Sequence, residues 1–329
     1  MKYLILGSNG FVAQHYINYL KNKKNIEIVG LDVNDQKNKN NLKNFTFIRS
    51  SLVDRKNLKK VIIKTNPDYI IHLAAHSSVA FSWEYPYESF TNNTYCFLNL
   101  LEELRILQSK AKVLLVGSSE EYGQVKLKDI PLKETTPLNP LNPYAISRAA
   151  QEQLAKIYAK AYGVNVICTR SFNHIGPNQP NHFVVSSFIK QAVEIKLGLR
   201  KNLTCGNIDI IRDFIDVRDV ITAYDLLIEF GEPGNVYNIC SGKGYALKEI
   251  IDLIKKIIAI DFDVIIDNYL IRPIDNPIII GSNKKLIKTT GFKLNYSMQE
   301  SIKDMIKIEL SKQKQSMPTK KALNTSINI

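Results

Sequence analysis

The sequence of 329 residues has few cysteines and no long apolar run. Its four cysteines are widely spaced and show no CxxC pairing, so a disulfide framework and a metal site are not predicted and a reducing compartment is expected. No apolar run approaches the roughly 18 residues that span a bilayer. The N-terminal stretch "MKYLILG" is also too short for a signal peptide. These absences predict a soluble, cytoplasmic protein without a membrane partner.

The chain also lacks a concentrated basic patch, although its formal net charge is +13. The positive residues are scattered through Lys- and Asn-rich stretches such as "KNKKN", without interleaved stacking aromatics. A nucleic-acid partner is therefore not predicted, whereas a small phosphorylated substrate suits the charge. With 45% hydrophobic and 23% charged residues, the composition is that of an ordinary globular protein with a sizeable core.

Short apolar runs alternate with amphipathic stretches through the first half of the chain. The continuous, β-branched character of the runs is typical of strands buried on both faces. We expect a doubly wound α/β parallel sheet of the Rossmann type. The expected strands are "KYLILG", "IEIVGLD", "FTFIRS", "DYIIHLAA", "AKVLLVGSS" and "VNVICTRSFN"; the expected helices are about 11–21, 54–64, 88–106 and 143–162.

The pattern becomes less regular after about residue 175. We expect a nucleotide-binding domain over 1–175, with a return segment over 206–225, and a smaller substrate-binding lobe over 176–310 that begins with a helix near 183–198. The polar, basic and aperiodic stretch 311–329 is expected to be a disordered tail.

The turn "GSNGFVA" follows the first strand and opens a helix, which places Gly7, Gly10 and Ala13 in a GxxGxxA arrangement. Such a turn lets backbone N–H groups and the helix N-terminus approach a pyrophosphate. Asp32 ends the second strand, where a carboxylate accepts hydrogen bonds from a ribose 2′-hydroxyl and repels a 2′-phosphate. This pattern favours NAD(H), with NADP(H) still possible; alternatively, Asp32 only shapes its turn.

The segment "NPYAISRAAQEQL" predicts a helix with Asn142 as N-cap, Pro143 at its first position and Gly163 at its end. Tyr144 and Arg148 then lie one turn apart on the same face. A nearby cation favours the ionised form of a phenol, which makes the pair a candidate acid–base. The alternative is an amphipathic helix in which Tyr144 is core and Arg148 is solvated.

A second candidate stretch, "VGSSEEYG", leaves the carboxyl end of the fifth strand, where open α/β sheets bind ligands. Ser118 can bond a sugar hydroxyl or keto oxygen, and Glu120 offers a carboxylate beside it. Serine-rich strand ends are common, so this motif indicates a ligand site only when it is taken together with the glycine turn and Tyr144.

The order of eight motifs along the chain resembles that of the extended short-chain dehydrogenase/reductases that act on nucleotide sugars. The motifs are "GxxGxxA", "HLAAHSSV", "GSSEEYG", "PLNPYAISR", "RSFNHIGPNQ", "RDFIDVRDV", "NVYNICSG" and "RPIDNPIIIGSNKKL". The resemblance covers about residues 1–305. It is strongest to GDP-4-keto-6-deoxy-D-mannose reductases, which form GDP-rhamnose, and then to GDP-mannose 4,6-dehydratases.

The resemblance implies a role for each matching residue. Ser118 would hold the reacting oxygen, Tyr144 would be the acid–base, and Arg148 would stand where the family has the lysine that binds the nicotinamide ribose. Arg212 and Arg272 would clamp the diphosphate, although either would otherwise be read as a surface residue. The implied cofactor contacts are Gly7, Asn9, Gly10, Phe11, Val12, Asp32, Ser51, Leu52, Leu73, Ala74, Ala75, Tyr144 and Arg148. The implied substrate contacts are Ser77, Ser119, Glu120, Asn173, Val184, Arg212 and Arg272.

The sequence departs from the family pattern at three positions. Arg148 keeps the positive charge but cannot relay a proton, so we expect an active, slower enzyme in which Arg148→Lys preserves or raises turnover. Ser51 stands where the family usually has an acidic residue that meets the adenine. Asp32 differs from the NADPH-type reductases that the chain resembles.

Three functions remain open from the sequence. The leading one is reduction of the C4 keto group of a nucleotide-linked, GDP-type 4-keto-6-deoxy sugar. The second is a 4,6-dehydratase or 4-epimerase that retains NAD, with Glu120 abstracting the C5 proton. The third is a non-catalytic nucleotide-sugar-binding protein. Helices near 89–106 and 143–162 match the family's dimer-forming pair, so a homodimer is expected, although the sheet alone could cover their apolar faces.

Overall fold

The computed structural model describes residues 1–36, 43–271 and 276–316. The chain divides into two compact units. Unit 1 comprises Met1–His174, Ile211–Gly244 and Asn276–Asn295, and the remaining described residues form unit 2.

The strands lie mostly where the apolar runs predicted them. They are β1 (Lys2–Leu6), β2 (Glu27–Asp32), β3 (Phe45–Arg49), β4 (Tyr69–His72), β5 (Lys112–Ser118), β6 (Val166–Ser171), β7 (Asn173–Ile175), β8 (Leu203–Cys205), β9 (Ile211–Asp216), β10 (Val236–Ile239), β11 (Gly244–Ala246), β12 (Val264–Ile266) and β13 (Ile278–Ile279).

The helices include four short 3₁₀ or π segments. They are α1 (Phe11–Leu20), α2 (Arg55–Thr65), α3 (Val79–Glu84), α4 (Pro86–Phe90), the π-turn η1 (Thr91–Tyr95), α5 (Cys96–Ile106), the 3₁₀ turns η2 (Ser119–Tyr122) and η3 (Leu127–Asp129), α6 (Pro143–Tyr162), α7 (Val184–Lys196), α8 (Val217–Phe230), α9 (Leu247–Ile258), the 3₁₀ turn η4 (Asn268–Leu270), α10 (Lys284–Thr290) and α11 (Met298–Ser316).

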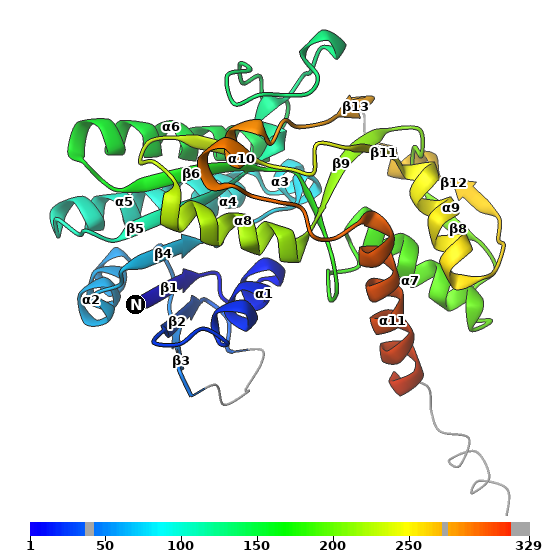
Figure 1. Cartoon of the computed structure of the whole chain (residues 1–329), viewed down its shortest axis with the longest axis horizontal. Helices are drawn as coiled ribbons and strands as arrows, with labels where there is room; N and C mark the ends of the chain where they lie inside the picture. Colours follow the sequence, from blue (N-terminus) through cyan, green and yellow to red (C-terminus); the bar gives the residue numbers. More distant parts are fainter. Residues whose placement is uncertain (37–42, 272–275, 317–329) are drawn as a thin grey trace, which may run out of the picture. The chain divides into compact units, whose positions relative to one another are not determined.

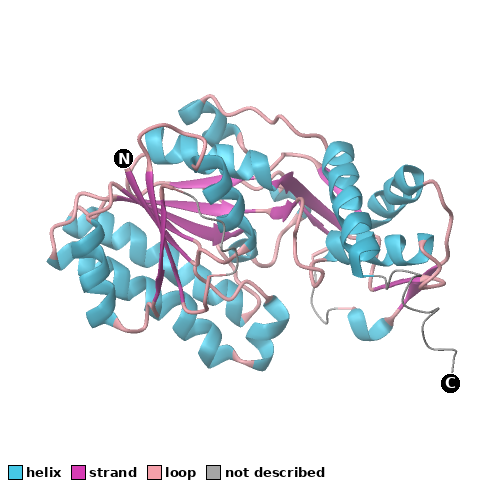
Figure 2. Cartoon of the chain, turned by 90° about the horizontal axis from the view of Figure 1, so that it is seen from below, coloured by secondary structure: helices cyan, strands magenta, loops and turns pink. Residues whose placement is uncertain are grey.

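A seven-stranded parallel sheet forms the centre of unit 1, with the strand order β10-β6-β5-β4-β1-β2-β3. The chain runs outward from β1 through β2 to β3, and then returns to β4 on the other side of β1. The strand order therefore reverses between β1 and β4, where open α/β sheets bind ligands at the strands' carboxyl ends. The predicted doubly wound sheet is confirmed (Figure 2).

Helices cover both faces of this sheet (Figure 1). One apolar cluster joins the sheet to α1 and α8, and a second joins it to α2, α5 and α6. Buried strands between two helical layers need apolar side chains on both faces, which explains runs such as "YLIL" in β1.

The capping residues that the sequence indicated for α6 act as expected. The Asn142 side chain accepts a hydrogen bond from the Ala145 N–H at 2.8 Å, and Pro143 occupies the first turn. Gly163 ends the helix at φ +68°, a conformation that glycine adopts without a Cβ clash. These caps fix where α6 begins, and so where Tyr144 lies.

Three predicted elements differ from the structure. The segment 88–106, which was expected to form one helix, is instead divided among the end of α4, the π-turn η1 and α5. The return segment predicted over 206–225 has other bounds, because residues 211–244 and 276–295 belong to unit 1 and β10 adds a seventh strand beside β6. The tail predicted from 311 is wrong up to Ser316, because α11 extends to that residue; residues 317–329 lie outside the described residues.

In unit 2, helices α7, α9 and α11 pack on one another, and β8 pairs with β12 in parallel. The helix predicted near 183–198 is α7.

All four cysteines of the chain are buried free thiols: Cys96, Cys168, Cys205 and Cys240. Over the described ranges, we find no helix with both the length and the apolar character needed to cross a bilayer.

Candidate active site

The turn between β1 and α1 forms a cradle without side chains. Gly7 has φ +80°, and a Cβ placed there would lie 2.7 Å from the backbone N and Cα of Ala74. The Gly10 N–H donates to the Gly7 carbonyl at 3.0 Å, and within the described chain no side chain caps α1. The first N–H groups of α1 therefore point out of the turn as donors. This arrangement fits the pyrophosphate of a dinucleotide.

Asp32, at the end of β2, closes one side of this turn. Its carboxylate accepts hydrogen bonds from the backbone N–H groups of Asn9, at 2.9 Å, and Asn34, at 3.1 Å. Asp32 therefore shapes its turn, as the alternative interpretation held. A carboxylate has about four acceptor positions, so these two bonds also leave capacity for ribose hydroxyls.

The other residues predicted to contact a cofactor lie in the loops around the turn. Phe11 and Val12 are half-buried at the start of α1. Leu73, Ala74 and Ala75 directly follow β4, and Ser51 and Leu52 follow β3. Leu52 is buried, and its carbonyl accepts a hydrogen bond from the Asn99 side chain at 3.0 Å. The structure thus brings these predicted residues to the carboxyl ends of β1 to β4.

Ser118 is the last residue of β5, and hydrogen bonds hold it on two sides. Its Oγ accepts from the Glu120 N–H at 3.2 Å, and its own N–H donates to Glu121 Oε1 at 2.7 Å. Glu120 Oε2 accepts from Asn142 Nδ2 at 3.2 Å. Because Asn142 caps α6, these contacts join the serine motif to the helix that carries Tyr144.

Tyr144 and Arg148 are both buried, each with 5% of its surface exposed. The guanidinium carbon of Arg148 lies 5.2 Å from the centre of the Tyr144 ring. The alternative of a solvated Arg148 is therefore wrong. A buried cation beside a phenol, bonded to the strand that ends at Ser118, has the composition of an acid–base site.

Four buried residues around this pair were missed by the sequence reasoning: His72, Asn93, Glu121 and Gln151. Burial, followed by the charge of Arg148, lowers the pKa of His72 to about 3, so its imidazole is neutral. Burial, followed by the charge of Glu152, raises the pKa of Glu121 to about 8. Gln151 stands three residues after Arg148, a spacing that could have identified it.

The residues predicted to contact substrate are divided between the units. Ser77 is exposed before α3. Ser119 is buried beside Ser118. The Asn173 amide donates to the Asp213 carbonyl at 3.2 Å. Arg212 is nearly buried in β9, which excludes the surface alternative for it. Val184 begins α7 in unit 2, and Arg272 lies outside the described residues.

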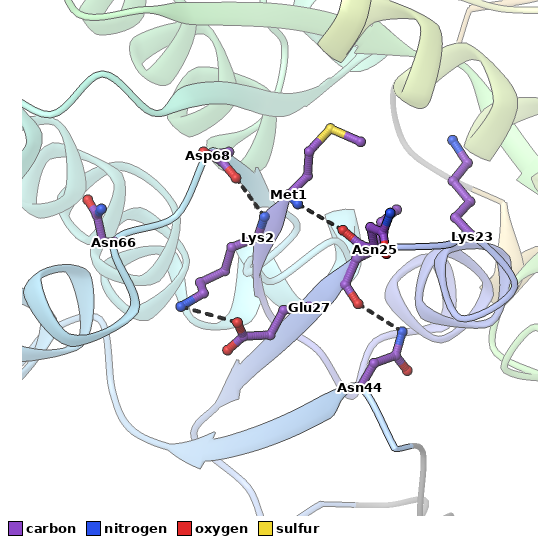
Figure 3. A pocket seen from close by; sticks show the side chains of 9 residues that line it. Met1, Lys2, Lys23, Asn25, Glu27, Asn44, Asn66 and Asp68 are labelled. Carbon is purple, nitrogen blue, oxygen red and sulfur yellow. Dashed lines mark hydrogen bonds and ion pairs between the residues drawn. The ribbon is translucent and has the colours of Figure 1, made fainter.

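A shallow depression of about 550 Å³ lies at the opposite ends of the strands, where β1, β2 and β3 begin (Figure 3). Its charged groups have partners within the protein: Lys2 pairs with Glu27 at 3.2 Å, Asp68 accepts from the Lys2 N–H at 2.7 Å, and Lys23 pairs with Asp225 at 2.6 Å. Because ligands of open α/β sheets bind at the carboxyl ends, we do not assign this depression to the active site.

Comparisons with known proteins show which family the chain belongs to. The family model "GDP-mannose 4,6 dehydratase" matches residues 4–305. GDP-6-deoxy-D-mannose reductase of Pseudomonas aeruginosa is 36% identical over 241 residues, which are 73% of this chain and 79% of that protein. GDP-mannose 4,6-dehydratase of Vibrio cholerae is 26% identical over 87% of this chain and 84% of that protein.

Solved structures give the same result. A structure of RMD from Pseudomonas aeruginosa complexed with NADPH has a TM-score of 0.84 and 31% identity, covering 95% of this chain and all of that one. UDP-glucose 4-epimerase from Thermotoga maritima, with UDP-glucose, has a TM-score of 0.87 and 26% identity over 95% of this chain and all of that one. With the family model matching nearly the whole chain, the protein belongs to the GDP-mannose 4,6-dehydratase family of extended short-chain dehydrogenase/reductases.

Proposed function

We propose that this protein is a nicotinamide-dependent reductase of the C4 keto group of a nucleotide-linked, GDP-type 4-keto-6-deoxy sugar. The observation that carries the proposal is the buried Tyr144–Arg148 pair on α6, which the contact between Asn142 and Glu120 links to the serine motif at the end of β5. It is supported by the similarity to a curated GDP-6-deoxy-D-mannose reductase. The product would enter deoxysugar and polysaccharide biosynthesis.

The residues present fit a dinucleotide cofactor. The Gly7–Gly10 turn would hold the pyrophosphate, Asp32 the adenosine ribose and Arg148 the nicotinamide ribose. The reduced nicotinamide supplies a hydride when it is bound. Asp32 favours NAD(H), because its carboxylate repels a 2′-phosphate. Arg49, which lies opposite Asp32 in the β2–β3 register, is the nearby cation that NADP(H) would require.

The chain's own groups would handle the sugar oxygen. Ser118 would donate a hydrogen bond to the keto oxygen, and Tyr144 would donate a proton to it as negative charge develops. The buried cation of Arg148 then stabilises the phenolate that remains. The low exposure of this group of residues keeps water out, which strengthens each of these interactions.

We assign cofactor binding to unit 1 and further sugar or nucleotide contacts to unit 2. In unit 1, Arg212 would bind the diphosphate, a role that suits a guanidinium. In unit 2, Val184 would contact the nucleotide sugar. The choice of guanine as the base rests on the family relationship.

A second candidate is a 4,6-dehydratase, or an epimerase, that keeps its nicotinamide cofactor through each turnover. It is favoured by Glu120, whose carboxylate stands two residues after Ser118 and is held by Asn142 at 3.2 Å. A carboxylate in this position suits removal of a proton from sugar carbon. The GDP-mannose 4,6-dehydratase of Vibrio cholerae is a relative with that activity in its name.

The deciding experiment follows the absorbance of reduced nicotinamide when purified protein meets GDP-4-keto-6-deoxy-mannose, with NADH and NADPH in separate runs. A reductase consumes reduced cofactor in proportion to substrate, and Tyr144→Phe should abolish this consumption. Conversion of GDP-mannose without net cofactor consumption would establish the dehydratase. Cofactor binding without any product would establish the non-catalytic alternative.

We also propose that the protein is a cytoplasmic homodimer that pairs through α5 and α6. Apolar side chains are exposed along these helices and at the end of η1, directly before α5, although the opposite faces of both helices pack on the sheet. The exposed residues are Tyr95, Ile106, Ile146, Ile157 and Tyr162. Ile146 and Ile157 lie three turns apart on one side of α6, which suits helix packing between two copies.

A further inference from the structure

Arg148 is a buried cation that two neutral oxygen atoms hold in place. Its Nη1 donates to the Val116 carbonyl at 2.9 Å and to Gln151 Oε1 at 3.1 Å, whereas its Nε has no partner among the described residues. No carboxylate lies within ion-pair distance of it in the described part of the chain. The direction of the guanidinium therefore depends on those two acceptors, because a buried charge without bonded partners is costly.

The Gln151 amide has only one orientation that satisfies both of its contacts. Gln151 is fully buried, and its Nε2 donates to the Asn93 carbonyl at 2.8 Å. Turning the amide over would place two oxygens against each other at Asn93 and two donors against each other at Arg148. The bond to Asn93 thus forces Oε1 toward Arg148.

Asn93 is itself fixed, because it lies within the π-turn η1. The wider turn opens its carbonyl to a side chain of α6, while the Asn93 side chain holds the neighbouring segments. Asn93 Oδ1 accepts from the His76 N–H at 2.9 Å, and Nδ2 donates to Ser147 Oγ at 2.9 Å. A chain of buried hydrogen bonds therefore runs from the π-turn through Gln151 to Arg148.

We propose that Gln151 is a positioning residue that aims the Arg148 guanidinium at Tyr144, and that the two residues work as a pair. This inference rests on the proposed function. The fork of a guanidinium has a direction that must be set, whereas the ammonium of a lysine is a point charge on a flexible stem. A lysine at this position would not need Gln151, and arginine does.

The test compares Gln151→Met, which keeps the size and removes the acceptor, with the wild type and with Thr94→Val. The control removes another buried hydrogen bond between η1 and α6, from Thr94 Oγ1 to the Ser147 carbonyl, without touching Arg148. We expect Gln151→Met to lower kcat about tenfold or more, the loss typical of one hydrogen bond to a charged group, with little change in KM. Thr94→Val should change only Tm.

The paired variant gives the sharper result. Adding Arg148→Lys to Gln151→Met should restore turnover to the level of Arg148→Lys alone, because the ammonium does not require the amide. The proposal is overturned if Gln151→Met leaves kcat unchanged, if Thr94→Val lowers kcat equally, or if the lysine gives no rescue. If Gln151→Met does not fold, Gln151→Asn serves instead, since its shorter side chain cannot reach from Asn93 to Arg148.

A measurement without substrate separates this proposal from the proposed function. The ¹⁵N–¹H signals of the Arg148 guanidinium, identified by their loss in Arg148→Lys, report how firmly the group is held. We expect resolved signals in the wild type and Thr94→Val, and averaged or absent signals in Gln151→Met. Unchanged signals in Gln151→Met would overturn the positioning role. Absence of turnover in a wild type that shows the expected signals would count against the proposed function alone.

Discussion

At the scale of single residues, two buried ionisable side chains bond to backbone groups near the end of β5. β4 ends at His72, opposite Leu115, so the last residues of β5 lack a strand on that side. Arg148 donates to the Val116 carbonyl, and Glu121 accepts from the Ser118 N–H. Side chains thus satisfy backbone groups that would otherwise be buried without partners.

Glu121 makes the stability of the protein depend on pH. Its pKa in the fold, about 8, lies above the ordinary value of 4.5. Its contribution to the free energy of unfolding is therefore full below about pH 4.5 and is lost as the pH rises toward 8. We expect Glu121→Gln, which cannot ionise, to lose less stability than the wild type between about pH 5 and 8.

Urea unfolding at several pH values measures this difference. Glu120→Gln provides the control, because Glu120 is its half-buried neighbour in the same turn. Equal pH slopes for the wild type and Glu121→Gln would show that Glu121 does not titrate as its burial implies.

At the scale of elements, the β1–α1 turn requires glycine for two reasons. Gly7 has a positive φ, and the Ala74 backbone leaves no room for a Cβ. We expect Gly7→Ala to cost about 1–3 kcal/mol of stability and to abolish cofactor binding, because the strand ends must separate. Calorimetric titration with NADH and with NADPH measures the binding.

Gly163→Ala is the matched control for this prediction. Gly163 has a similar φ of +68°, but a Cβ there would meet nothing within 4 Å. It should lose stability through backbone strain alone and still bind the cofactor. If both variants bind equally well, the close approach of Gly7 to Ala74 is not what the cofactor site requires.

The π-turn is the element that the sequence could not reveal. Periodicity correctly indicated helical residues over 88–106, but a π-turn inserts one residue without changing the composition of the segment. Asn93 favours the π-turn over a regular helix, because its side chain bonds to His76 and Ser147, which come from other parts of the chain. Only the packed structure brings these partners together.

At the scale of the whole molecule, the proposed dimer makes a direct prediction about α6. Ile157 is 57% exposed on the face that we assign to the interface. Ile157→Asp should convert the dimer to a monomer in light scattering, because pairing would bury a charge. Ile287→Asp is the control, since Ile287 is 44% exposed on α10 and should leave the dimer intact. A wild-type monomer would exclude the interface.

The sequence by itself determined the parallel sheet, the glycine turn, the caps of α6 and the candidate residues Ser118, Tyr144 and Arg148. Each of these depends on local features, namely apolar periodicity, backbone freedom and helix capping, that can be read within a few residues. The tertiary structure alone decided that Arg148 is buried, that Gln151 and Glu121 surround the site, and that β10 completes the sheet. These facts depend on contacts between residues far apart in the sequence, and no local pattern encodes the partner across such a distance.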